Sequence, residues 1–228
     1  MLTPLLSTLH ANFPRVRLDV LASPKAIALL EGLATVETWI HFRKRALFAP
    51  DGPLRTPRRL RRERYDLAID ASNPTDPSAT HAILVRLSGA AHTIGADRAG
   101  FGALFSAPVS IDPSGHEIDL RLQLLKPLGC ESLIHAPSLP APSKQAIESV
   151  ADFVEQIKRP FVLLNVGARL VEKQLDAKQY ALLADLVPPE CATLITFGPR
   201  EEEIAKEVAA IVPNAILGPN TRLDELAV

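Results

Sequence analysis

Two cations follow a strand-like segment in the C-terminal third of the chain, and a carboxylate follows the next such segment. Arg169 and Lys173 come shortly after the apolar run 161–164, and Glu201 comes shortly after the apolar run 192–197. Lysine and arginine side chains bind phosphate oxygens through charge-assisted hydrogen bonds. The pattern therefore predicts a phosphate or diphosphate site, and an ordinary strand-to-helix turn is the alternative.

The elements around these residues have the order strand, loop, helix. The run 161–164 (FVLL) is continuously apolar, which is typical of a strand buried on both faces of a parallel sheet. Asn165, Gly167 and Ala168 form a Gly-containing loop whose backbone N–H groups could bind an anion. Asp176 is placed to cap the helix that follows.

Glu201 has two interpretations. It begins the helical segment 201–211, where an acidic residue is favoured by the helix macrodipole. Its carboxylate could instead accept hydrogen bonds from the hydroxyl groups of a ribose or from a base. Consecutive strand–helix units place such side chains at the carboxyl edge of a parallel sheet, where ligands bind in α/β proteins.

Composition excludes several classes of protein. The chain has 228 residues, 47% of them hydrophobic, and a net charge of −1, so no overall field favours nucleic acid or membrane. The two cysteines are far apart and the six histidines are scattered, so we expect neither a disulfide framework nor a metal site. GxSxG, P-loop and GxGxxG motifs are absent, which argues against serine hydrolases, P-loop NTPases and dinucleotide oxidoreductases.

The chain reads as two α/β halves. A Pro-rich segment at 137–143, the expected linker, separates residues 1–136 from residues 144–228, and each half is expected to be an α/β domain. No apolar stretch approaches the roughly 20 residues needed to cross a bilayer, and the first residues do not resemble a signal peptide. We therefore expect a cytoplasmic protein.

A strongly basic segment occupies residues 43–64. One interpretation is a surface for an anionic partner such as a phosphorylated lipid or a nucleic acid, and the other is a solvated loop and helix face. Nucleic acid is the weaker partner, because aromatic residues for base stacking are not interleaved with the arginines at 55–64.

Several motifs resemble one known family in their order and spacing. The chain resembles the lipopolysaccharide heptosyltransferases, which form glycosyltransferase family 9 and have the GT-B fold. The matching segments are TPLLSTLHANFP at 3–14, YDLAID with its polar loop at 65–76, GADR at 95–98, GHEID at 115–119, NVGARLVEK at 165–173 and FGPREEE at 197–203.

This resemblance implies a fold and a reaction. The fold would be α/β with two Rossmann-like domains of GT-B type, the C-terminal one incomplete. Residues 1–136 would form the N-terminal acceptor-side domain, and residues 144–228 would form part of the C-terminal nucleotide-sugar-binding domain. The enzyme would transfer a heptose or related sugar from an ADP-sugar to a lipopolysaccharide inner-core acceptor by inverting displacement, without a cofactor or an obligatory metal. Ala168, Arg169 and Lys173 would line the donor diphosphate, Glu201 would contact the nucleoside, and Lys173 would stabilise the leaving group.

The sequence departs from the family pattern in three places. Leu175 and Asp176 stand where a Trp-Pro pair is usual. The family's first strand with its Gly-Asp loop, which supplies the proposed base, would precede Met1, and a donor-phosphate segment would follow Val228. A second hypothesis is therefore a truncated, non-catalytic remnant or binding protein that retains the fold. The resemblance also implies a cytoplasmic protein that works as a peripheral protein at the inner membrane, without nucleic acid as a partner.

Overall fold

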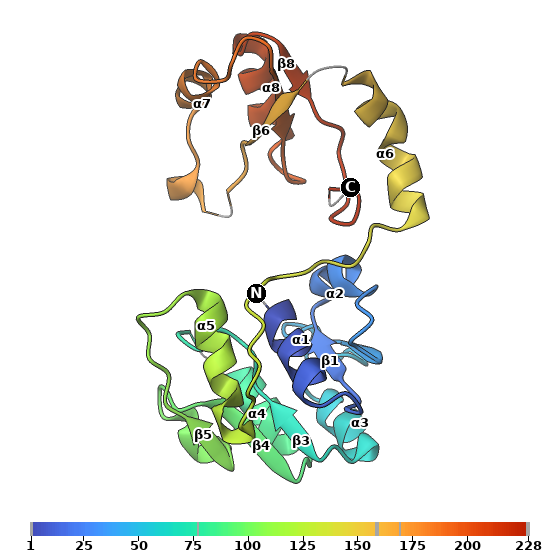
Figure 1. Cartoon of the computed structure of the whole chain (residues 1–228), viewed down its shortest axis with the longest axis vertical. Helices are drawn as coiled ribbons and strands as arrows, with labels where there is room; N and C mark the ends of the chain where they lie inside the picture. The colour runs from blue at the N-terminus through green and yellow to red at the C-terminus, as the bar shows by residue number, and fades with distance from the viewer. Residues whose placement is uncertain (1, 77, 158–159, 169, 227–228) are drawn as a thin grey trace. The chain divides into compact units, whose positions relative to one another are not determined.

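The computed structural model describes residues 2–76, 78–157, 160–168 and 170–226. The chain divides into two compact units, Met1–Ala141 and Pro142–Val228. Helices and strands alternate along both units, and every strand pairing is parallel (Figure 1). The predicted α/β class is therefore confirmed.

The first described element is the helix α1 (Thr3–Asn12). Pro4 lies in its first turn, where proline favours a helix start. The elements that follow α1 in this unit are β1 (Asp19–Ala22), α2 (Pro24–Leu30), β2 (Thr38–His41), α3 (Thr56–Glu63), β3 (Leu67–Ile69), α4 (Ala79–Leu87), β4 (His92–Ala96), η1 (Phe101–Leu104), β5 (Ala107–Val109), α5 (Glu117–Leu122) and η2 (Gln123–Leu128).

The strands of the first unit form two parallel groups. β1 pairs with β2, with Val20 opposite Trp39, while β3, β4 and β5 form a second group in that order. In the described part of the chain, β1 and β3 each pair along one edge only. One hydrophobic cluster nevertheless includes residues of both groups, among them Val20 of β1 and Ile94 of β4.

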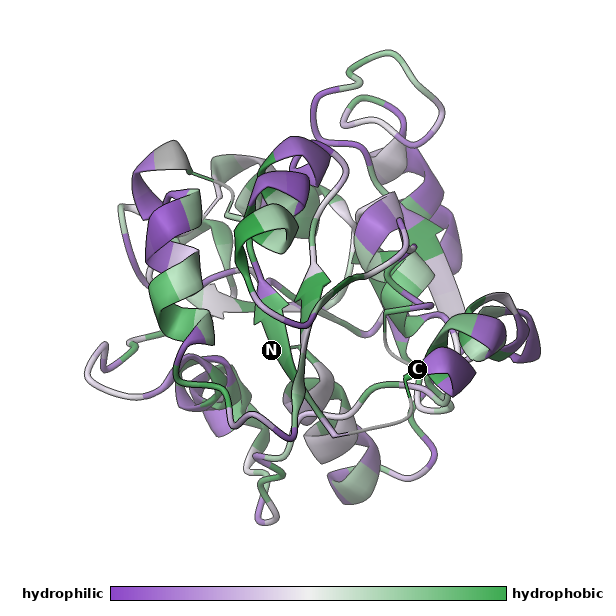
Figure 2. Ribbon diagram, turned by 90° about the horizontal axis from the view of Figure 1, so that it is seen from above, coloured by the Kyte–Doolittle hydropathy of each residue, from purple (hydrophilic) through white to green (hydrophobic). Residues whose placement is uncertain are grey.

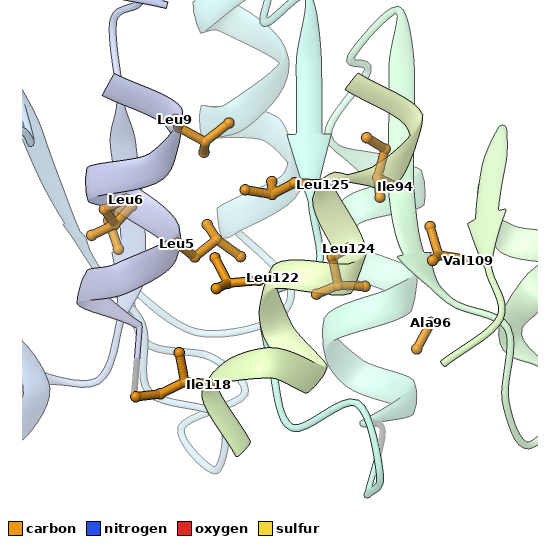
Figure 3. Packing of buried hydrophobic residues seen from close by; sticks show 11 residues of the cluster. Leu5, Leu6, Leu9, Ile94, Ala96, Val109, Ile118, Leu122, Leu124 and Leu125 are labelled. Carbon is orange, nitrogen blue, oxygen red and sulfur yellow. The ribbon is translucent and has the colours of Figure 1, made fainter. Parts of the chain in front are cut away.

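Helices α1 and α5, with η2, supply most of that cluster. Figure 3 shows Leu5 and Leu9 of α1 beside Leu122 and Leu125, which follow on α5 and η2. Leu124 and Leu125 are at most 1% exposed, so this helical layer seals one face of the strands. Burying a leucine side chain contributes about 1.5–3 kcal/mol, so each of these leucines stabilises the unit.

Two features of the first unit were not expected from the sequence. Strand β5 was not predicted, because it has three residues and Pro108 lacks the N–H that a strand interior normally donates. The helix that begins at Glu117 is α-helical only to Leu122 and continues as the 3₁₀ segment η2, which contains Pro127.

The Pro-rich segment 137–143 has no regular secondary structure. The chain that leads into this segment packs against α1. Thr8 Oγ1 accepts from the N–H of Ile134 at 2.9 Å, and Thr3 Oγ1 accepts from the N–H of Ser138 at 3.1 Å. The hydroxyls that α1 turns inward thus fix the path of the chain up to the start of this segment.

The second unit repeats the strand–helix order. Its elements are α6 (Lys144–Gln156), β6 (Phe161–Asn165), η3 (Val171–Lys173), α7 (Ala177–Ala184), β7 (Ala192–Thr196), α8 (Glu202–Ile211) and β8 (Ala215–Leu217). The sheet order is β6-β7-β8, as expected for consecutive right-handed βα units. Figure 2 shows both green and purple turns on the helices, the colouring of amphipathic segments that bury one face.

The expectation that β6 is buried on both faces is wrong. Phe161, Val162 and Leu163 are 47%, 40% and 51% exposed. The buried cluster of this unit draws on α7, α8 and β7, and Leu164 is the residue of β6 that packs against it. The apolar run correctly predicted a strand, but its burial depends on which elements cover it. Among the described strands, β6 pairs with β7 only, along one edge.

Candidate functional site

The ends of β6 and β7 bring two loops together. The parallel register places Asn165 opposite Thr196, the last residues of the two strands. The N–H of Val166 then donates to the carbonyl of Thr196 at 3.1 Å, which extends the pairing by one residue. The loops after β6 and β7 therefore begin side by side at the carboxyl edge of the sheet, where the sequence pattern placed the candidate residues.

Asn165 shapes the first loop. Its Oδ1 accepts from the N–H of Gly167 at 3.0 Å, which forms an Asx turn directly after the strand. The N–H groups of Val166 and Gly167 are thus engaged within the protein. Ala168, which follows, is half-buried. The N–H of Ala168, in contrast, has no acceptor among the described residues.

The carboxylate of Glu201 occupies the space between the two loops. Its Oε2 accepts from the N–H of Gly198 at 2.7 Å. A Cβ atom on Gly167 would lie 2.0 Å from the same Oε2, and one on Gly198 would lie 2.7 Å from it. Both glycines are therefore required by the close approach of Glu201, and the loops of β6 and β7 meet at this half-buried side chain.

Tyr180 and Gln174 support the first loop from behind, and sequence reasoning missed both. The carbonyl of Val166 accepts from Tyr180 Oη at 3.1 Å and from Gln174 Nε2 at 3.4 Å. Val166 is fully buried and Tyr180 is 5% exposed. The available signal was a tyrosine on the apolar face of a helix, because a buried tyrosine hydroxyl usually has a hydrogen-bond partner.

The N-terminus of α7 is capped by its own side chains, as the sequence predicted for Asp176. Asp176 Oδ1 accepts from the N–H of Gln179 at 2.8 Å, and Gln179 Oε1 accepts from the N–H of Asp176 at 3.0 Å. A carboxylate therefore already occupies the first turn of α7. An anion bound at this edge would depend on the cationic side chains of the loop more than on the N–H groups of this helix.

Of the two cations predicted for this site, Lys173 lies within the described residues. It ends the 3₁₀ segment η3, its N–H donates to the carbonyl of Leu170 at 3.0 Å, and its side chain is exposed. Arg169, the other predicted cation, lies outside the described residues. The structure thus brings Asn165, Gly167 and Glu201 into contact, while Lys173 stands on the same loop with its ammonium group open to solvent.

Polar groups also collect after β3 in the first unit. Asp70 is 8% exposed, and its Oδ1 accepts from the N–H of Ser72 at 3.1 Å. His81 packs edge-on against Phe42, with ring centroids 6.0 Å apart. Burial lowers the pKa of His81 below its ordinary value, and the nearby Asp70 carboxylate opposes part of that shift. The imidazole is therefore held neutral at physiological pH.

The described residues include no group of three His, Cys, Asp or Glu side chains arranged to hold a metal ion. Two surface hollows of about 530 and 490 Å³ lie elsewhere, in the first unit. The larger is lined by residues of α5, η2 and segment 129–135, and the smaller by arginines in and just before α3. No helix in the described ranges is both long and apolar enough to cross a membrane.

The chain belongs to glycosyltransferase family 9 (heptosyltransferase), whose family model matches residues 54–228. This match includes the loops after β6 and β7 and the whole of the second unit. A comparison with curated proteins found no match.

Solved structures of this family have the same fold. A glycosyl transferase family 9 structure from Veillonella parvula aligns with 99% of this chain at a TM-score of 0.81 and 18% identity. E. coli heptosyltransferase WaaC with ADP aligns with 99% at 0.71 and 18% identity, and E. coli ADP-heptose lps heptosyltransferase II aligns with 98% at 0.69 and 19% identity. The chain spans 66%, 71% and 70% of the lengths of these three proteins, respectively.

Proposed function

We propose that the protein binds an ADP-sugar and transfers a heptose or related sugar to an acceptor of the lipopolysaccharide inner core. The family model and the fold support a glycosyltransferase of this family. Two solved relatives support the donor, since one is described with ADP and another is described as an ADP-heptose lps heptosyltransferase. The observation that carries the proposal is the meeting of the β6 and β7 loops around Glu201, with Lys173 on the first loop.

The proposed roles follow from chemistry and position. The Glu201 carboxylate accepts hydrogen bonds from nucleoside hydroxyls, and its contacts with Gly167 and Gly198 fix where those hydroxyls bind. Lys173 and Arg169 bind the diphosphate, to which the backbone of Ala168 also donates. Asn165 and Gly167 hold the loop in shape through the Asx turn.

In the transfer step, an acceptor hydroxyl oxygen attacks the anomeric carbon and forms the new glycosidic bond. The bond from that carbon to the diphosphate oxygen breaks, its electron pair leaves with ADP, and the configuration at carbon inverts. The proton of the acceptor hydroxyl is released to solvent water. The Lys173 ammonium stabilises the negative charge that develops on the departing diphosphate. We propose that this step uses neither a metal nor a cofactor, and that the protein acts in the cytoplasm at the inner membrane surface.

Calorimetric titration of ADP into the 228-residue chain tests the donor site. Lys173→Ala should weaken ADP binding by about 1.5–3 kcal/mol, roughly 10- to 150-fold, which is the scale of a hydrogen bond to a charged group. Lys178→Ala is the matched control, because Lys178 is also exposed and lies on the neighbouring α7. Its affinity should equal that of the unmodified protein.

Three results would contradict the donor-site assignment. An unchanged affinity in Lys173→Ala would remove this lysine from the site. An equal loss in both lysine variants would indicate a non-specific effect of charge. Absence of ADP binding by a chain that circular dichroism shows to be folded would favour a non-catalytic protein that retains the family fold.

A further inference from the structure

Four arginines form a stripe along one side of α3 and its N-terminal flank. Arg55, Arg58, Arg59 and Arg62, called here the arginine stripe, are spaced i, i+3, i+4 and i+7, so they share one helix face. All four are exposed and, with Leu54, they line the surface hollow of about 490 Å³. Thr56 and Leu60, 2% and 8% exposed, anchor the opposite side of the helix.

The charges of the stripe are not used within the fold. Within the described residues, no acidic side chain lies within ion-pair distance of any of the four arginines. Nearby Arg43, in contrast, binds Asp51 at 2.7 Å, and Arg61 donates to the carbonyl of Leu87 at 2.9 Å. Like charges at i, i+4 destabilise a helix, so the stripe is a feature that folding alone does not favour.

An apolar loop immediately precedes the stripe. The N–H of Arg43 donates to the carbonyl of Asp51 at 3.0 Å, and the ion pair of the same two residues closes the base of the loop. Leu47 and Phe48, called here the apolar tip, are 51% and 80% exposed. A Cβ atom on Gly52 would lie 1.9 Å from the carbonyl oxygen of Ala46, so the loop is tightly closed behind its tip.

We propose that the arginine stripe and the apolar tip form a docking surface for an anionic lipid bilayer. Residues 43–64 contain nine basic and two acidic side chains, whereas the whole chain has a net charge of −1. Guanidinium groups bind lipid phosphates. Insertion of a phenylalanine side chain at the boundary between headgroups and acyl chains is favourable, because it removes apolar surface from water. A basic surface with an adjacent apolar tip supplies the two attractions that peripheral membrane binding combines.

Two observations favour a bilayer over a nucleic acid as the partner. The apolar tip is exposed, and α3 has no aromatic side chain on which a base could stack. The sequence between Arg55 and Arg62 contains no aromatic residue, so bases would find no stacking platform among the arginines. The tip offers Leu47 and Phe48, which contribute nothing to phosphate binding but favour insertion between lipids. The proposal does not depend on ADP binding or sugar transfer.

Co-sedimentation of the 228-residue chain with vesicles tests the surface. Vesicles of mixed phosphatidylcholine and phosphatidylglycerol should bind the chain at low salt, and vesicles of phosphatidylcholine alone should bind it much less. The triple variant Arg58→Gln, Arg59→Gln, Arg62→Gln should weaken binding to the anionic vesicles on the order of 100-fold. Phe48→Ser should weaken it about tenfold, and high salt should weaken it in the unmodified chain.

The matched control removes the same charge elsewhere on the first unit. Arg15→Gln, Lys25→Gln and Arg86→Gln change three exposed cations outside segment 43–64 and should lower vesicle binding only slightly. Circular dichroism of both triple variants excludes unfolding as the cause. Equal losses in the two triple variants, equal binding to both kinds of vesicle, or binding of a single-stranded oligonucleotide without vesicle binding would each overturn the proposal. ADP titration of the same variants separates this outcome from failure of the donor site.

Discussion

The two cationic regions of this molecule are built in opposite ways. The Lys173 loop has one described cation, and side-chain hydrogen bonds hold the loop from both sides, through Asn165 to Gly167 and through Tyr180 to Val166. The arginine stripe has four cations on a regular helix and no acidic partner among the described residues. One arrangement suits a single small anion in a fixed position, and the other suits an extended anionic surface.

The difference lies in how geometry and charge contribute to binding. A diphosphate carries its charge on a few oxygens, so recognition depends on fixing a loop within fractions of an ångström. A bilayer presents many phosphates without fixed positions, so total charge matters more than the placement of any one side chain. Salt should therefore weaken vesicle binding by the stripe more than ADP binding by the loop.

A substitution at Gly167 should have the largest effect on the loop side of this comparison. In Gly167→Ala the new methyl group would meet Glu201 Oε2 and displace it from the N–H of Gly198. The displaced carboxylate would no longer accept the proposed hydrogen bond from a nucleoside hydroxyl. Loss of that hydrogen bond to a charged group predicts ADP binding weaker by about 1.5–3 kcal/mol in calorimetric titration. Gly115→Ala is the control, since its new Cβ atom would have ordinary contacts, the nearest at 3.4 Å.

Vesicle binding by Gly167→Ala should equal that of the unmodified chain. If the substitution weakened vesicle binding as much as ADP binding, the two cationic regions would not be independent. If it changed neither, the contact between Glu201 and Gly167 would have no role in donor binding.

Each unit has one tyrosine whose hydroxyl donates a hydrogen bond within the fold. Tyr65 Oη donates to Asp19 Oδ2 at 2.7 Å, and the Asp19 side chain is 2% exposed, whereas Tyr180 donates to a neutral carbonyl. Denaturant unfolding should show a loss of about 1.5–3 kcal/mol for Tyr65→Phe and about 0.5–1.5 kcal/mol for Tyr180→Phe. Tyr180→Phe should also weaken ADP binding, whereas Tyr65→Phe should not. Equal costs in the two variants would show that the charge on Asp19 adds nothing to its hydrogen bond.

The half-buried His81 of the first unit should make the stability of the protein depend on pH. Burial lowers the pKa of His81 below its ordinary value of 6.5, so the unfolded chain takes up a proton in a range where the folded chain does not. The free energy of unfolding should therefore decrease as the pH falls below about 6.5. His81→Gln should flatten this decrease in denaturant titrations at several pH values. An unchanged pH profile in that variant would mean that another group causes the loss.

Asp19 acts in a lower pH range. Burial alone would raise its pKa, but the hydrogen bonds from Arg17 and Tyr65, together with the positive charge of Arg17, outweigh that effect and lower the pKa below the ordinary 3.8. A carboxyl group with a lowered pKa stabilises the folded state above its ordinary pKa, and this contribution is lost as the pH falls through the lowered folded value. Its loss therefore follows that of His81 on acidification.

Much of the local structure could be predicted from the sequence. The strands that begin at Phe161 and Ala192 and the cap at Asp176 depend on residues within a few positions of each other, so the local sequence was enough to predict them. The order of strands and helices in turn predicted parallel pairing. The motif NVGARLVEK and its neighbours indicated the family that the family model confirms.

Tertiary structure decided the features that depend on distant residues. The exposure of β6, the hydrogen bond from Tyr180 to Val166 and the position of Glu201 against Gly167 each depend on how separate segments pack. A sequence pattern shows that a residue is apolar or charged, but not which surface will cover it or which partner will reach it. For the same reason the sequence did not show which arginines of the basic segment 43–64 lie on one exposed helix face. The structure shows that the arginine stripe does, without acidic partners among the described residues.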